Sequence, residues 1–212
     1  YIAKQNHKNI AILHSVNTYY ESIYESCVEQ LEAQGAKLGS KYAIDPKFSD
    51  FRSLILKLKN ENVDAVIALL QESGEMNSFL KQSRELDLDV QIYAADITFD
   101  EVILKKPELA NDVILFRYIS TANQEFAKRY SERFKVPSNL GIGEAYDNVF
   151  IIKEAIEKCG DKTEQIRECL HKINYKGVSG IVTFDKNGII NSDRKVTELQ
   201  TVKDGKFVPL NL

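Results

Sequence analysis

The side chains that most often perform catalysis are scattered along this chain. His7, His14 and His171 show no paired spacing that would hold a metal ion. The P-loop pattern and the G-x-S-x-G turn of hydrolases do not occur in the sequence. Gly141-Ile142-Gly143 lacks the third glycine and the preceding strand of a dinucleotide site. The sequence therefore predicts no catalytic residue, no metal site, no cofactor and no enzyme. His14, at a predicted strand end, is expected to be a satisfied edge histidine.

The three cysteines form no C-x-x-C pattern, which argues against metal ligation. Cys159 and Cys169 flank a short turn between two predicted helices, where they can approach each other. Either they form a disulfide, which requires Cα atoms within about 7 Å, or they remain reduced and partly buried. Cys27 lies in an amphipathic segment and is expected to pack in the core.

Polar and aromatic side chains follow several predicted strands. Tyr19, Glu72, Ser73 and Asp96 all come just after such strands. Open parallel sheets bind ligands beyond the carboxyl ends of their strands, so the candidate binding site lies among residues 15–20, Asp45, 71–73, Asp96 and 117–118, which include these four. They include no nucleophile–base pair and suit a polar, cationic or zwitterionic small molecule. At a strand end Asp96 is either a helix cap or a ligand contact, whereas Asp45 is expected to form a turn.

The elements that position these residues alternate between strand and helix in the first half of the chain. Short apolar runs, such as residues 63–70, are typical of buried parallel strands. The segments between them carry apolar residues at i, i+3, i+4 and i+7, as Phe51, Leu54, Ile55 and Leu58 do. Predicted strands are 9–14, 36–44, 63–70, 90–94 and 113–116, with helices from about 18 to 35, 51 to 58 and 76 to 86. This order predicts an α/β, Rossmann-like parallel-sheet lobe, with Ser15 or Asn17 capping the first helix.

The second half is mainly helical. Amphipathic helices are predicted near 121–134, 143–158 and 163–173, and short strands at 181–184, 195–202 and 206–209. These strands are too few to bury the apolar helix faces. Either the helices pack as a cluster, or they belong to a second sheet whose strands are absent from this chain. In the second case the chain alone is expected to bind a hydrophobic dye or to associate into dimers.

Charge and hydropathy exclude two classes of protein. The formal net charge is −3, whereas a nucleic-acid binder needs a basic surface, so no nucleic-acid partner is expected. No apolar run approaches the roughly 20 residues that cross a bilayer. The chain begins with Tyr1 rather than Met, so we expect that a preceding segment has been removed.

Several motifs, taken in order, resemble the type I periplasmic binding proteins of the Leu/Ile/Val-binding branch. They are residues 10–13 with Tyr19, 50–52, 63–66, 75–84, 145–149 and the G-x-x-G-x-x-x-F-D-x-x-G segment at 177–188. The resemblance implies two Rossmann-like lobes that are joined by three crossings and close on a ligand. It assigns residues 1–118 to the C-terminal lobe, residues 119–190 to the later part of the N-terminal lobe, and residues 191–212 to a segment that returns to the C-terminal lobe. The first part of the N-terminal lobe would then be absent.

The same resemblance implies roles for the candidate residues. Amino-acid binders of the family hold the α-carboxylate through a segment of the N-terminal lobe that this chain lacks. Asp96 and Tyr19 match the acidic residue and the tyrosine that meet the α-ammonium. A second tyrosine of branched-chain binders is replaced here by Glu72, with Ser73 beside it. The extra carboxylate favours a more polar or more cationic ligand.

The function implied is that of an extracytoplasmic solute-binding protein of an ABC importer, which binds an amino acid or similar small polar molecule. Its partners would be this ligand and the transporter permease. The location would be periplasmic or extracellular, with or without a lipid anchor, and the signal segment would lie outside this chain. The alternative is the extracellular sensor domain of a signalling receptor, which a transmembrane segment and a signalling domain in the full gene would reveal.

Overall fold

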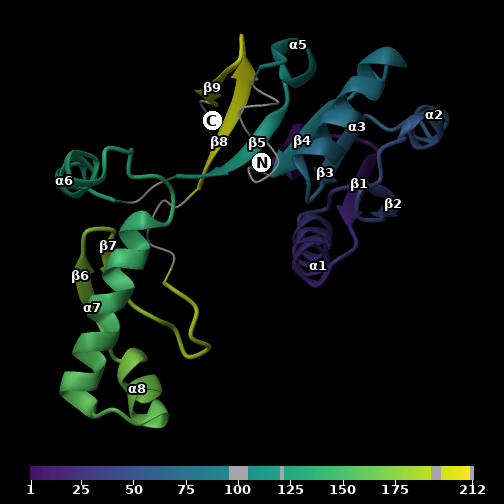
Figure 1. The fold of residues 1–212 in the computed structure, drawn as a ribbon. Coiled ribbons are helices and arrows are strands. Elements are labelled where there is room, and N and C mark those ends of the chain that lie inside the picture. Colours follow the sequence, from purple (N-terminus) through teal and green to yellow (C-terminus); the bar gives the residue numbers. More distant parts are fainter. Residues whose placement is uncertain (96–104, 120–121, 192–196, 211–212) are drawn as a thin grey trace. The chain divides into compact units, whose positions relative to one another are not determined.

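The computed structural model of the protein describes residues 1–95, 105–119, 122–191 and 197–210 (Figure 1). The chain divides into two compact units. Unit 1 comprises Tyr1–Arg117 with Leu199–Leu212, and unit 2 comprises Tyr118–Glu198. Each unit is described by itself below. Asp96 lies outside the described residues.

Unit 1 is built on a seven-stranded sheet with the strand order β2-β1-β3-β4-β5-β8-β9. The first five strands in the chain pair in parallel, and β8 and β9 pair antiparallel. The strands are β1 (Ile10–Ser15), β2 (Leu38–Ile44), β3 (Ala65–Leu69), β4 (Gln91–Ala95), β5 (Ile114–Tyr118), β8 (Thr197–Lys203) and β9 (Lys206–Pro209). This arrangement confirms the predicted α/β class and the parallel sheet.

Helices cover both faces of this sheet, and alternate side chains of each strand point to opposite faces. Along β1, Ile10 and Ile12 pack towards α1 (Thr18–Ala33) and the short 3-10 helix η1 (Ile2–Gln5). Ala11 and Leu13 belong to the core under the other helices. Those helices are α2 (Arg52–Asn60), α3 (Ser73–Glu85) and α5 (Pro107–Ala110). Two apolar cores therefore pack on the two faces of the sheet.

The first helix begins as the sequence predicts. The side chain of Asn17 accepts a hydrogen bond from the Tyr20 backbone N–H at 2.9 Å, so Asn17 is the N-cap of α1. The helix ends before Gly35, whose φ of 76° lies in the left-handed region that glycine adopts readily. These two signals mark the beginning and the end of α1.

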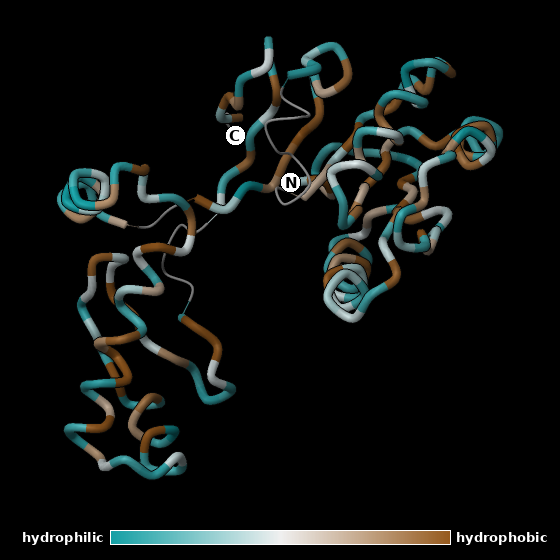
Figure 2. The backbone as a smooth tube through the Cα atoms, in the orientation of Figure 1, coloured by the Kyte–Doolittle hydropathy of each residue, from teal (hydrophilic) through white to brown (hydrophobic). Residues whose placement is uncertain are grey.

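Unit 2 consists of three helices and a short hairpin in its described part. They are α6 (Gln124–Phe134), α7 (Ile142–Cys159), α8 (Thr163–Leu170), β6 (Tyr175–Gly177) and β7 (Gly180–Val182). A small core joins Ile151, Ile173 and Val182. Val149 on α7 remains 66% exposed, and Ile152 and Ile156 are also exposed. Figure 2 shows apolar stretches along this helix. As predicted from the sequence, the helices carry more apolar surface than the described strands of this unit cover.

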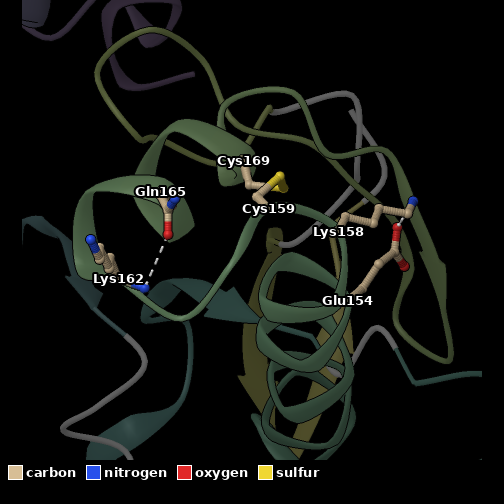
Figure 3. Close-up of a disulfide and its surroundings, with 6 residues drawn as sticks. All are labelled: Glu154, Lys158, Cys159, Lys162, Gln165 and Cys169. Carbon is tan, nitrogen blue, oxygen red and sulfur yellow. Dashed lines mark hydrogen bonds and ion pairs between the residues drawn. A yellow bond between two sulfur atoms is a disulfide. The ribbon is translucent and has the colours of Figure 1, made fainter.

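A disulfide joins Cys159 at the end of α7 to Cys169 on α8, with their Cα atoms 6.1 Å apart (Figure 3). The sequence was compatible with a disulfide and with two reduced thiols, and the structure contains the disulfide. Between the cysteines, the Lys162 backbone N–H donates to the Gln165 side chain at 3.4 Å, which helps the turn into α8. Cys27 is the free cysteine; it packs against the core beneath α1, and burial raises the pKa of its thiol.

Replacing both Cys159 and Cys169 with alanine is expected to lower the free energy of unfolding by roughly 3 kcal/mol. The bond closes a loop with a sequence separation of 10 residues, and it restricts the unfolded chain by about this amount in the loop-entropy model. Thermal unfolding with and without dithiothreitol measures the effect. The reductant should lower the melting temperature of the wild type and of a Cys27→Ala control, but not that of the double variant. An unchanged wild-type melting temperature would contradict the prediction.

Candidate ligand-binding edge

The loops that follow β1 and β3 are tied together at the carboxyl edge of the sheet. The two strands are parallel neighbours, so their carboxyl ends meet at the same edge. The side-chain amide of Asn17 donates to the Gln71 side-chain oxygen at 2.6 Å. The Gln71 backbone N–H donates to the Ser15 hydroxyl at 2.8 Å. These bonds bring the start of α1 close to the start of α3.

Tyr19 lies in the first turn of α1 and is 53% exposed, so its ring is available to a ligand. It packs edge-on against Tyr20, with ring centroids 5.3 Å apart. Tyr20 is buried, and burial raises the pKa of its hydroxyl to about 12, with further contributions from Tyr19, Glu75 and Glu72. Carboxylates from the start of α3 thus lie near the tyrosine pair of α1.

Glu72 and Ser73 begin α3. Glu72 is the N-cap residue and is exposed, and its carboxylate accepts a hydrogen bond from the Gln71 side chain at 3.2 Å. Ser73 is the first helical residue and is half-buried. The structure therefore places Tyr19, Glu72 and Ser73 at one edge of the sheet, as the strand-end argument predicts. Asp96, the fourth candidate, follows β4 in the sequence and falls outside the described residues.

Glu75 is a residue of this edge that the sequence argument did not select. It is only 2% exposed and accepts hydrogen bonds from the Ser15 hydroxyl and from the backbone N–H groups of Lys47 and Glu72. A signal was present in the sequence, because Glu75 stands three residues after the N-cap, where a capping-box glutamate reaches back to the helix start. That spacing does not reveal the bonds to Ser15 and Lys47.

His14 corrects one prediction. It is 9% exposed, and no described residue hydrogen-bonds its Nδ1 atom, so it is not the satisfied edge histidine that we expected. Its ring instead stacks on Tyr24 of α1, with centroids 4.3 Å apart. The stacking holds the imidazole between β1 and α1. Asp45 does form a turn, because its carbonyl accepts from the Phe48 N–H at 3.1 Å.

In unit 2 the structure brings two of the motifs together. The carboxylate of Asp147 is 1% exposed and accepts from the Val178 N–H at 2.9 Å, from the Ser179 N–H at 2.8 Å and from the Ser179 hydroxyl. Gly177 has no room for a β-carbon, which would overlap this carboxylate. Asp147 and the glycine-containing hairpin therefore form one structural unit that fixes β6 and β7 against α7.

The edge of unit 1 carries groups that can contact a small molecule. It presents an exposed tyrosine ring, a carboxylate and small polar groups at the starts of two helices. Within the described ranges, no group of three His, Cys, Asp or Glu side chains could hold a metal ion. The helices that the structure describes are also too short or too polar to cross a membrane. A parallel sheet whose strand ends carry such groups is typical of α/β proteins that bind small molecules.

The family to which the chain belongs is that of the periplasmic binding proteins, whose sequence pattern matches residues 1–206. This match confirms the resemblance found in the motifs. A binding protein for leucine, isoleucine, valine, threonine and alanine from Pseudomonas aeruginosa is 27% identical over 187 residues, which cover 85% of this chain and 50% of that protein.

Solved structures share the fold. A leucine-binding protein from Thermotoga maritima superposes with a TM-score of 0.78 at 19% identity, over 98% of this chain and 61% of that one. An ABC-transporter solute-binding protein from R. palustris in complex with benzoate gives 0.76 at 16% identity, over 99% and 59%. The chain thus spans about half the length of the curated relative and about three fifths of these structures.

Proposed function

We propose that this chain is part of an extracytoplasmic solute-binding protein of an ABC importer, which binds an amino acid or a similar small polar molecule. The observation that carries the proposal is the edge of unit 1. There a member of the periplasmic binding protein family presents Tyr19, from the first turn of α1, together with Glu72 and Ser73 at the start of α3. The protein would hold its ligand without changing it chemically and deliver it to a permease.

Within this proposal, residues 1–118 and 191–212 belong to the C-terminal lobe and residues 119–190 to the N-terminal lobe. The compactness of unit 1, to which β8 and β9 contribute, supports the first assignment. The exposed apolar side chains of α7, such as Val149, support the second. In the whole protein these side chains would be covered by a sheet of the N-terminal lobe whose strands lie outside this chain.

The roles proposed for the individual residues follow the charges at the edge. Asp96 and Tyr19 would meet the ammonium group of the ligand, and Glu72 would tune its specificity. The α-carboxylate would be held by the N-terminal lobe. Glu72 is exposed and lies near a second carboxylate, that of Glu75, so the edge attracts positive charge. We therefore place the ligand among polar or cationic amino acids rather than aromatic acids such as the benzoate bound by the R. palustris relative.

Mass spectrometry of the full-length protein under non-denaturing conditions tests this function. We expect one bound small molecule per chain, with the mass of an amino acid or a close derivative. After removal of this ligand by unfolding and refolding, calorimetric titration with each standard amino acid should give 1:1 binding for at least one. Benzoate, which has no ammonium group, is the control and should not bind. Absence of both a retained molecule and any heat from the amino acids would refute the proposal.

A further inference from the structure

One buried carboxylate connects the segments that form the candidate edge. Oε1 of Glu75 accepts from the Lys47 backbone N–H at 2.8 Å. Oε2 accepts from the Ser15 hydroxyl at 3.1 Å and from the Glu72 backbone N–H at 3.3 Å. These donors come from the end of β1, the loop after β2 and the start of α3. Burying a charge is costly unless donors satisfy it, so the carboxylate and the three segments depend on one another.

The connection extends to the first turn of α1. The fully buried Ser15 hydroxyl donates to Glu75 and accepts from the Gln71 N–H at 2.8 Å. Gln71 in turn accepts from Asn17, the N-cap of the helix that carries Tyr19. A continuous series of hydrogen bonds therefore runs from Glu75 to the helix turn on which the exposed tyrosine lies.

The backbone of Lys47 supports a positioning role. Its φ of 68° lies in the left-handed region, which is unfavourable for a residue with a side chain. The hydrogen bond from its N–H to Glu75 is one of the contacts that hold this conformation. A helix-capping role alone would explain the bond to Glu72, but not those to Lys47 and Ser15.

We infer that Glu75 is a positioning residue of the binding edge, which sets the affinity for the ligand without touching it. The inference rests on the function proposed above. Glu75 is 2% exposed and lies beneath the edge, whereas Tyr19, Glu72 and Ser73 lie on segments that its hydrogen bonds hold. Its carboxylate fixes the distance between the loops that would contact the ligand.

The variant Glu75→Gln in the full-length protein tests this inference. Glutamine keeps the size of the side chain but replaces one acceptor oxygen with a donor NH₂, so at least one of the three donors loses its partner. The probe is the standard amino acid that the wild type binds most tightly. We expect its dissociation constant to rise roughly 10- to 100-fold, measured by calorimetry well below the melting temperature of every variant. Ser15→Ala removes the same connection with a smaller change and should also weaken binding, which keeps the test available if Glu75→Gln does not fold.

Gln82→Ala is the matched control. Gln82 is also buried on α3; it accepts from the Phe51 N–H at 2.6 Å and donates to the Ser49 carbonyl at 2.7 Å. Its replacement should therefore destabilise the same unit. Gln82 forms neither of these bonds with Ser15, Gln71 or Glu72, so the edge keeps its own hydrogen bonds. The inference holds if both variants melt at lower temperature but only Glu75→Gln loses affinity.

Equal loss of affinity in Glu75→Gln and Gln82→Ala would overturn the inference, because affinity would then follow general stability. Unchanged affinity in Glu75→Gln would also overturn it, while leaving the proposed function intact. If the wild type retains no small molecule and binds no amino acid, the proposed function fails and the inference fails with it.

Discussion

Replacing Asp96 with alanine in the full-length protein is expected to weaken amino-acid binding by roughly 30- to 3,000-fold. Asp96 directly follows β4, whose carboxyl end lies at the same edge of the sheet as those of β1 and β3. A carboxylate in a closed, water-excluding site forms a charge-assisted hydrogen bond with a ligand ammonium. Loss of one partner costs about 2–5 kcal/mol, because the other charge stays buried and unpaired. Calorimetric titration measures the change.

Asp89→Ala provides the control for that variant. Asp89 is exposed and precedes β4, so it lies at the opposite end of the same strand, and its replacement should leave affinity unchanged. If Asp96 is instead a helix cap, Asp96→Ala would lower stability by about 0.5–2 kcal/mol and change affinity less than about threefold. That result would show that Asp96 is structural and would contradict its proposed contact with the ligand.

The fold of unit 1 could be predicted because its sequence patterns are unambiguous. Residues 63–70, for example, are apolar except for Asp64 and are too few for a helix, which indicates a buried strand. The segments between them have helical periodicity, and Asn17 provides a cap. The alternation of such elements leaves few topologies other than a parallel sheet covered on both faces. The position of Tyr19, Glu72 and Ser73 at one edge then follows from that topology.

Other features depend on contacts that a linear pattern does not carry. The three-residue strand β6 has no alternation of its own, since it is the sequence Tyr175-Lys176-Gly177. Its neighbours Val178 and Ser179 are held by Asp147, about 30 residues away. The bond between Ser15 and Glu75 likewise spans 60 residues. Polar groups of this kind become predictable only when the surrounding elements have been placed, because their partners are donors from distant segments.

The state of Cys159 and Cys169 also could not be predicted from the sequence pattern alone. Their spacing is compatible with a bond and with two thiols alike, and the orientation of α7 and α8 decides between them. His14 is another case. Its position at the end of a strand suggested hydrogen bonds at the sheet edge, but the ring of Tyr24, ten residues later on α1, holds it by stacking.

Asp147→Ala is expected to lower the stability of unit 2 by about 2–4 kcal/mol. The carboxylate accepts from two backbone N–H groups and one hydroxyl at the turn between β6 and β7, and alanine leaves all three without this acceptor. Most of the loss should come from the two donors of Ser179, which is buried away from water. The Val178 N–H should contribute less, because Val178 is half-buried and can bond to water instead. Hydrogen exchange of peptides that cover residues 175–182 measures the effect on this unit alone. Protection there should fall by roughly 30- to 1,000-fold, which is the same change expressed as an equilibrium constant.

Asn148→Ala is the control for this prediction, because Asn148 is the next residue of α7 and is exposed. It should leave the exchange of residues 175–182 unchanged. Asp147→Asn keeps one acceptor oxygen at the same position, so its effect should lie between those of the wild type and Asp147→Ala. If Asp147→Ala exchanges no faster than Asn148→Ala, the hairpin is held by the packing of Val182 against Ile151 and Ile173, and not by the buried carboxylate. A graded loss from Asn to Ala would instead assign the hairpin to Asp147, since Asn retains one acceptor oxygen for these donors and Ala retains none.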